Sequence, residues 1–134
     1  MTQASWSRLR LRRTEHLRDM LAETTFGVAN LIQPVFVVDG MSGSEAIAGL
    51  GDTARHGRRA AIDAIARDVA AGVRHFILFS VPSTKATQAL DFSSLGRDVE
   101  TIKKEFGDAL HLWVDICLCS STSHGHCSLL DEAG

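Results

Sequence analysis

The segment His75-Phe-Ile-Leu-Phe79 most constrains the fold, because it is a nearly continuous apolar run. A strand with one face in water alternates apolar and polar residues, whereas a continuous run predicts a strand covered on both faces. The run ends at Ser80-Val-Pro-Ser83, a turn signal. Further strands are predicted at 31–38, where Pro34 suits a strand end or edge, and at 111–118.

Helical periodicity fills the stretches between these strands. Apolar residues spaced i, i+3, i+4 and i+7 predict a helix over 58–71, and Leu95, Val99, Ile102 and Phe106 on a shared face predict another over 95–106; each is followed by a glycine. Ser93 or Ser94 is suited to cap the second helix. Residues 39–57 contain five glycines and are predicted to form a long loop. The alternation of strands and helices predicts parallel pairing through right-handed crossovers, which is an α/β fold.

The composition is that of an ordinary globular chain, with 45% hydrophobic and 22% charged residues among 134. No apolar run approaches the roughly 20 residues needed to cross a bilayer. No apolar segment follows the N-terminal arginines, as a secretory signal would require. The net charge of −2 argues against nucleic acid as the main partner. We therefore expect a cytoplasmic protein that binds neither nucleic acid nor membrane.

Residues 1–28 are polar and arginine-rich, with a short helical stretch around Glu15 to Glu23. The arginines within the first eighteen positions are Arg8, Arg10, Arg12, Arg13 and Arg18. Three interpretations remain open for this segment: a solvated basic tail, an arm that docks on another subunit, or a weak anion-binding patch.

The three cysteines, Cys117, Cys119 and Cys127, are too few and too clustered for a disulfide framework. In a reducing compartment, clustered cysteines indicate metal binding or thiol chemistry. If residues 111–119 form one strand, Asp115, Cys117 and Cys119 share a face at its C-terminal end. That is the end of a parallel sheet where ligands bind.

The polar loop from Ser120 to His126 is suited to return Cys127 to the other two thiols. Three thiolates at about 2.3 Å would leave the fourth tetrahedral position of a zinc ion open to water or substrate. His124 or His126 would close that position in a structural site, and zinc is the default metal for sulfur ligands.

Less specific interpretations also remain for these residues. Buried cysteines often act as small hydrophobic residues, and His124 or His126 would lower the pKa of a nucleophilic thiol. Asp115 is either part of a site or a paired structural carboxylate. His111 and Trp113, farther back on the same strand face, are expected to be packing residues.

The segment Asp115-Ile-Cys-Leu-Cys-Ser-Ser-Thr-Ser-His-Gly-His-Cys127 closely resembles the zinc-binding segment of porphobilinogen synthase, also called 5-aminolevulinate dehydratase. Three other segments resemble the same family. Asn30 to Gly40 is similar to its first barrel strand, Leu9 to Thr14 to its arginine-rich arm, and Leu129 to Gly134 to the continuation after the cysteines. The resemblance spans nearly the whole chain.

This resemblance implies a (β/α)8 barrel, with an arm that embraces a neighbouring subunit in a homo-octamer. It implies condensation of two molecules of 5-aminolevulinate to porphobilinogen in tetrapyrrole and haem synthesis. By residue matching, Cys117, Cys119 and Cys127 would be zinc ligands, and the ion with its water would assist the substrate in the second site. Asp115 matches the active-site aspartate that precedes the cysteines.

The chain also departs from the family pattern. Ser120-Ser121 replaces the usual Pro-Tyr, and the Pro-Gly turn after the first strand is not recognisable in Ala48 to Thr53. The family's chemistry depends on two lysines that form Schiff bases on later strands. The lysines of this chain are Lys85, Lys103 and Lys104, and none matches those positions.

The predicted organisation is therefore an arm over 1–28 and an incomplete barrel over 29–134, with the zinc segment at 115–127. Three strands and two helices are about three-eighths of a barrel that typically needs ~250 residues, so strand edges and one sheet face should be unpacked. We expect either an N-terminal part of a porphobilinogen synthase, inactive alone, or a non-enzymatic zinc-binding or assembly remnant that associates with full-length subunits. A small independent α/β domain that uses the thiols for other chemistry is a third hypothesis.

Overall fold

A five-stranded sheet forms the centre of the protein in the computed structural model, which describes residues 10–87 and 90–129. Its three longest strands are the predicted ones: β1 (Ile32–Val38), β4 (His75–Val81) and β5 (His111–Val114). They are parallel neighbours, because β4 pairs with both β1 and β5 in parallel register. The α/β class predicted from the alternation is confirmed.

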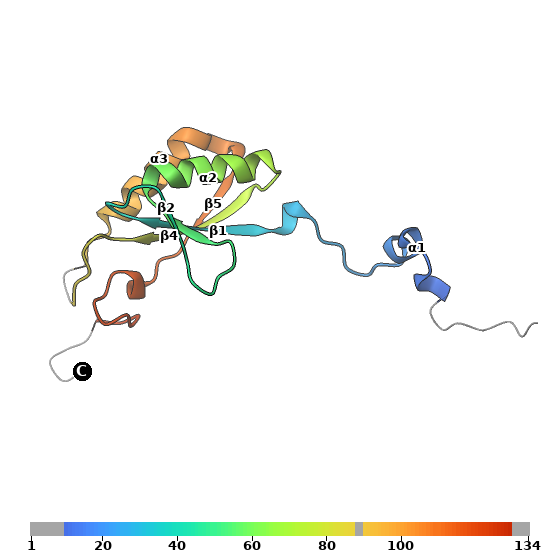
Figure 1. Ribbon diagram of the computed structural model, residues 1–134, viewed down its shortest axis with the longest axis horizontal. Helices are drawn as coiled ribbons and strands as arrows, with labels where there is room; N and C mark the ends of the chain where they lie inside the picture. Colours follow the sequence, from blue (N-terminus) through green and yellow to red (C-terminus); the bar gives the residue numbers. More distant parts are fainter. Residues whose placement is uncertain (1–9, 88–89, 130–134) are drawn as a thin grey trace, which may run out of the picture.

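The two long helices, α2 (Arg58–Ala70) and α3 (Ser93–Phe106), lie over the same face of this sheet (Figure 1). Both crossovers thus pass on one side, as consecutive right-handed connections require. Strand residues that point to the helices form the core together with the apolar sides of the helices. The buried core residues are Val35, Val37, Phe76, Leu78, Ala61, Ile62, Ile65, Ile102 and Leu110.

The opposite face of the sheet has no covering layer among the described residues. Along β4, buried residues alternate with half-buried ones, so the prediction that this strand is covered on both faces is wrong for the chain as described. The second face is apolar nonetheless, and Phe36 stacks on Phe79 with ring centroids 4.9 Å apart. The continuous apolar run at 75–79 therefore reflects a second sheet face that is apolar but uncovered in the described residues. This agrees with the expectation of one unpacked face.

A β-hairpin occupies the segment that was predicted to be only a loop. Strands β2 (Ser44–Ala46) and β3 (Ala54–His56) pair with each other in antiparallel register, and β3 adds to β1 in parallel at Phe36 and Val37. Each strand has three residues among glycines, too short to give a periodic signal. A β-carbon on Gly57 would overlap the Met41 carbonyl, so the close approach of the hairpin to the chain after β1 requires glycine there.

Glycine and aspartate residues next to the helices determine where α2 ends and where α3 begins. After α2, Gly72 has φ +101° and its N–H bonds to Val69, while the Val73 N–H bonds to Asp68, which is a Schellman ending. Helix α3 begins two residues earlier than predicted. The carboxylate of Asp91, rather than Ser93 or Ser94, accepts a hydrogen bond from the first helical N–H, that of Ser93, at 2.8 Å.

The N-terminal segment extends away from the sheet (Figure 1). Its helix α1 (Glu15–Met20) contains no buried residue and is capped by Thr14, whose hydroxyl accepts a hydrogen bond from the Leu17 N–H at 3.2 Å. Large apolar side chains of this segment are exposed, including Leu11, Met20, Leu21 and Phe26. Positions 1–9 of the expected arm, Arg8 and Leu9 among them, and positions 130–134 of the family-like C-terminal segment lie outside the described residues.

Candidate metal centre

The cysteines follow β5, but the strand ends earlier than predicted. Its last residue is Val114, and the Asp115 N–H makes the next bond to β4, to the Leu78 carbonyl at 2.9 Å. The chain then turns through a single 3-10 turn at Leu118–Ser120. The expectation that strand alternation puts Asp115, Cys117 and Cys119 on one face is therefore wrong, because the chain there is not a strand.

The turn nevertheless brings the three sulfurs together. The Sγ atom of Cys117 lies 3.0 Å from that of Cys119 and 3.1 Å from that of Cys127, and all three lie within 4.8 Å of one another. None is in a disulfide. Among the described residues, no other group of three or more metal-binding side chains converges in this way.

The thiols shift one another's pKa because their sulfurs are hydrogen bonded to each other. Hydrogen bonds from Cys119 and Cys127 lower the pKa of Cys117. The hydrogen bond to Cys117, together with burial, raises the pKa of Cys119 to about 11, and the bond to Cys117 also raises that of Cys127. A divalent cation would relieve this competition by replacing the shared protons, and three soft sulfur donors fit zinc.

Backbone hydrogen bonds fix the cysteine loop, which we define as residues 115–127. The segment after β4 pairs with it, since the Ala86 N–H bonds to the Ser121 carbonyl and the Ser123 N–H to the Ala86 carbonyl. The hydroxyl of the fully buried Thr122 donates to the His126 carbonyl at 2.9 Å. The last contact holds the residue just before Cys127, and thereby directs that thiol back to the other two.

Neither histidine of the loop joins the three sulfurs. The Nδ1 atom of His124 accepts the His126 N–H at 3.2 Å, and the two rings stack on each other. Within the described part of the chain, no histidine is hydrogen bonded to a cysteine, so a histidine-activated thiol is not formed. The Nε2 atom of His124 is buried without a hydrogen-bond partner. The arrangement favours an open three-thiol site over a site closed by histidine.

Asp115 is half-buried beside the cysteines. It lines a cavity of about 10 Å³ together with Cys117, Ser80 and Ser121, a space that holds about one water molecule. Its carboxylate makes no hydrogen bond or ion pair with any described residue. By contrast, His111 and Trp113 are exposed on the open sheet face, where their rings contact each other edge-on at 5.1 Å. Their expected packing role is wrong for this chain.

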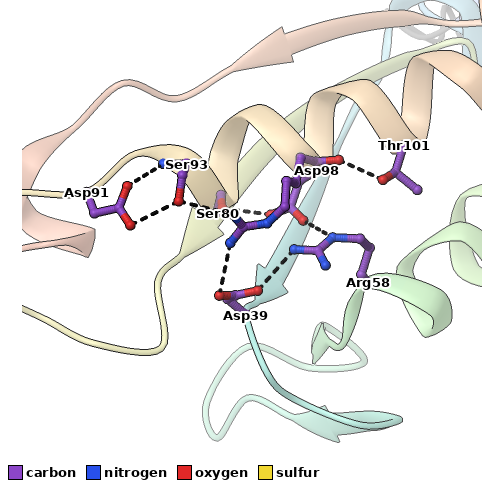
Figure 2. Close-up of polar contacts among 8 residues, drawn as sticks. Asp39, Arg58, Ser80, Asp91, Ser93, Asp98 and Thr101 are labelled. Carbon is purple, nitrogen blue, oxygen red and sulfur yellow. Dashed lines mark hydrogen bonds and ion pairs between the residues drawn. The ribbon is translucent and has the colours of Figure 1, made fainter.

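A second polar cluster was missed by the sequence reasoning (Figure 2). We call it the charged clamp; it consists of Asp39, Arg58, Ser80, Arg97 and Asp98. The Asp98 carboxylate, 1% exposed, accepts Arg58 Nε at 2.6 Å and the Ser80 hydroxyl at 2.7 Å. Asp39 accepts the guanidinium groups of Arg58 at 3.0 Å and Arg97 at 3.4 Å. Hydrogen bonds to Asp98 and Asp39 raise the pKa of Arg58 and keep it charged.

The sequence did contain a signal for this clamp. Asp98 falls between Leu95 and Ile102 on the apolar stripe of α3, at the spacing of the buried positions. A carboxylate at such a position requires a buried partner. That partner comes from Arg58 at the start of α2, a contact across forty residues that no local pattern reveals.

Comparison with known proteins points to one family. A family model described as Delta-aminolevulinic acid dehydratase matches residues 6–134. The dehydratase of Mycobacterium tuberculosis (strain ATCC 25618 / H37Rv) is 33% identical over 131 residues, covering 93% of this chain and 40% of that protein. The Bos taurus dehydratase is 34% identical over 119 residues, covering 84% of this chain and 36% of that protein. The chain thus spans about two-fifths of the length of these curated relatives.

Structural comparison agrees. The fold matches a crystal structure of the Toxoplasma gondii ME49 delta-aminolevulinic acid dehydratase, solved in complex with the reaction product porphobilinogen, with a TM-score of 0.83. The match covers 95% of this chain and 37% of that one at 24% identity. This similarity bears out the expected fold, an α/β portion of the barrel. No helix in the described residues is long and apolar enough to cross a membrane.

Proposed function

The chain belongs to the delta-aminolevulinic acid dehydratase family, and from this membership we propose that it is the zinc-carrying portion of a cytoplasmic enzyme that condenses two molecules of 5-aminolevulinate to porphobilinogen. The observation that carries the proposal is the convergence of Cys117, Cys119 and Cys127. The sulfur of Cys117 lies within hydrogen-bonding distance of both other sulfurs, so three soft donors are placed where one ion can bind them.

In this proposal the three cysteines hold zinc, which would act as a Lewis acid on a substrate oxygen or a bound water. Asp115 is the catalytic carboxylate of the portion, placed beside Cys117 at the edge of the small cavity. Because no described group donates to its oxygens, this carboxylate is free to accept a proton from a substrate amine or from water.

In this proposal the chain does not supply the lysine amines that would form Schiff bases with the two substrates. Lys103 is hydrogen bonded to the Gly107 carbonyl at 2.5 Å on the exposed side of α3. Lys104 and Lys85 are exposed, and the lining of the metal centre's small cavity contains no lysine. We therefore propose that residues 1–134 alone bind zinc but do not form porphobilinogen.

Zinc binding tests the first part of the proposal. Metal analysis of the reduced chain should find about one zinc. Cys119→Ala should weaken binding by more than the roughly 10–100-fold lost when a group that only hydrogen bonds to a metal ligand is removed. The matched control is Ser123→Ala, an exposed position of the same loop, which should bind zinc normally. Absence of zinc from the reduced, unmodified chain would overturn the assignment.

Substrate trapping tests the second part. The zinc-loaded chain is mixed with 5-aminolevulinate and borohydride, which reduces a Schiff base to a stable amine. We expect no mass increase and no porphobilinogen. Zinc-dependent turnover, or a specific adduct on Lys85, Lys103 or Lys104, would contradict the proposal.

A second candidate, assembly with full-length dehydratase subunits, is favoured by the exposed apolar residues of the N-terminal segment. Phe26 is 81% exposed and contacts no core. If this segment docks on another subunit, Phe26→Ser should reduce co-purification with a full-length dehydratase. Leu50→Ser removes an exposed apolar side chain from the hairpin instead and should have no effect. Equal recovery of both variants with the partner would exclude docking through this segment.

A further inference from the structure

The buried carboxylate of Asp98 has no part in the proposed chemistry, and its position requires an explanation. It is 1% exposed, and both oxygens are used, one by Arg58 Nε and one by the Ser80 hydroxyl. Burying such a group costs several kcal/mol unless its partners are well placed. The clamp therefore fixes three elements to one another: the start of α2, the second turn of α3 and the end of β4 (Figure 2).

Ser80 connects the clamp to the metal centre. It is buried at the penultimate position of β4, and its hydroxyl donates a hydrogen bond to Asp98 on one side. On the other side, Ser80 lines the small cavity that Asp115 and Cys117 also line. A displacement of Ser80 would therefore change the wall against which Asp115 and Cys117 lie.

The end of β4 is also the platform of the cysteine loop. Asp115 begins the loop with its N–H bonded to Leu78, two residues before Ser80. Farther along, the segment after β4 pairs through Ala86 with Ser121 and Ser123. Both attachments of the loop thus depend on where β4 ends, and the clamp sets that position.

We propose that Asp98 is a positioning residue for the metal centre: with Ser80 and Arg58 it holds the end of β4 where the loop presents its three sulfurs to one ion. This inference deepens the proposed function and rests on the zinc site assigned there. Asp98 touches neither the metal nor substrate and acts only through β4 and the loop.

Two variants of the full chain test the role. Asp98→Asn removes the charge, and Ser80→Ala removes one hydroxyl and is the milder change if Asp98→Asn folds poorly. The matched control is Ser44→Ala, which removes a hydroxyl bond of the same 2.7 Å length, to His56, at the opposite edge of the sheet. Zinc affinity is measured by chelator competition, and ligand geometry by the absorption bands of the cobalt-substituted protein.

We expect zinc affinity to fall about tenfold in Asp98→Asn and Ser80→Ala, which is the low end of the loss seen when a group that orients a metal ligand is removed. The cobalt absorption bands should shift in both variants. The control Ser44→Ala should match the unmodified chain in zinc affinity and in its bands. Ser80→Thr should recover the affinity lost in Ser80→Ala, because it restores the hydroxyl. Unchanged affinity and unchanged bands in Ser80→Ala would overturn the proposal.

Amide hydrogen exchange separates failure of this inference from failure of the zinc site. In metal-free protein, Ser80→Ala should speed exchange at the Asp115 and Ser123 N–H groups and leave the hairpin N–H of Ile47, bonded to Thr53, unchanged. If the unmodified chain binds no zinc, the zinc assignment fails. The amide exchange rates of the metal-free protein then decide by themselves whether Asp98 and Ser80 position the loop. Equal exchange at all three amides in variant and unmodified chain would refute that role.

Discussion

The charged clamp and the cysteine loop lie at the same end of the sheet, after the C-terminal ends of parallel strands, but their polar groups are satisfied differently. In the clamp, both oxygens of Asp98 have donors from neighbouring elements. In the loop, the side-chain partners of the Cys117 sulfur are the sulfurs of Cys119 and Cys127, which are thiols like itself. All the partners of the clamp come from the chain itself, whereas in our proposal a zinc ion completes the loop.

This difference indicates how stability and function are divided. A buried, fully paired carboxylate makes the fold depend on the clamp but offers nothing to a ligand. Converged thiols that perturb one another's pKa contribute little to the fold but offer a metal three donors already in place. Variants in the two regions should therefore fail in different ways.

The largest effect on folding is expected from Asp98→Ala. It leaves the Ser80 hydroxyl and Arg58 without their buried acceptor, and such a loss costs about 3 kcal/mol of unfolding free energy, at the low end of the range because Arg58 is 33% exposed. Urea denaturation measures the change. Asp63→Ala, which breaks the exposed pair with Arg59, is the control and should cost less than about 0.5 kcal/mol. Equal losses would mean that the clamp is no more important than a surface pair.

The loop should respond to metal rather than to loss of a protein contact. Zinc at 100 times its dissociation constant should stabilise the folded chain by about 2.7 kcal/mol, seen as a higher melting temperature that a chelator reverses. Cys127→Ser should abolish this gain and barely change the melting temperature of the metal-free chain, because Cys127 is exposed. A zinc-dependent gain that persists in Cys127→Ser would show that the ion binds elsewhere.

The same contrast explains what the sequence predicts. The parallel strands and their covering helices were predictable, because apolar runs and the stripe that includes Ile62 and Ile65 reflect burial directly. Convergence of the cysteines was also predictable, but the point where the strand ends was not, and a 3-10 turn brings Cys119 beside Cys117. Loop geometry depends on bonds such as Ser123 to Ala86, which join distant segments and have no local pattern.

Other features were hidden for related reasons. The hairpin strands have three residues each, below the length at which alternation can be detected. Asp98 gave a local signal, a carboxylate on an apolar stripe, but its partner Arg58 lies forty residues away in sequence. The periodicity of the sequence thus predicts the sheet and the helices that cover it. Side-chain contacts between those elements are known only from the folded structure.

Within the clamp, the outer arginine should matter much less than the inner one. Arg97 is 51% exposed and reaches Asp39 at only 3.4 Å, so Arg97→Ala should cost about 0.5 kcal/mol. The effect should shrink further at high salt, because exposed charges are screened. Urea denaturation at low and high ionic strength measures both. A loss as large as that of Asp98→Ala would show that the clamp is not organised around its buried carboxylate.

The smallest effect is expected from pH, and it should come from the hairpin rather than from the clamp or the loop. Burial and then the positive charge of Arg67 lower the pKa of His56, against an opposing effect of Asp68. The unfolded chain therefore takes up this proton at a higher pH than the folded chain does. The contribution of neutral His56 to the free energy of unfolding is complete above pH about 6.5, and it is lost as the pH falls through the lowered pKa of the folded chain.

Denaturation midpoints between about pH 5 and 8, with the His56 ring titrated by NMR, measure this contribution. His56→Gln should flatten the fall in stability on the acid side, and Arg67→Gln should reduce it by removing one cause of the shift. Asp63→Ala, on the same helix α2 but not among the causes of the shift, should leave the slope as it is. If the slope survives His56→Gln, a titrating group outside the hairpin controls acid stability, and the clamp and the loop become the regions to test.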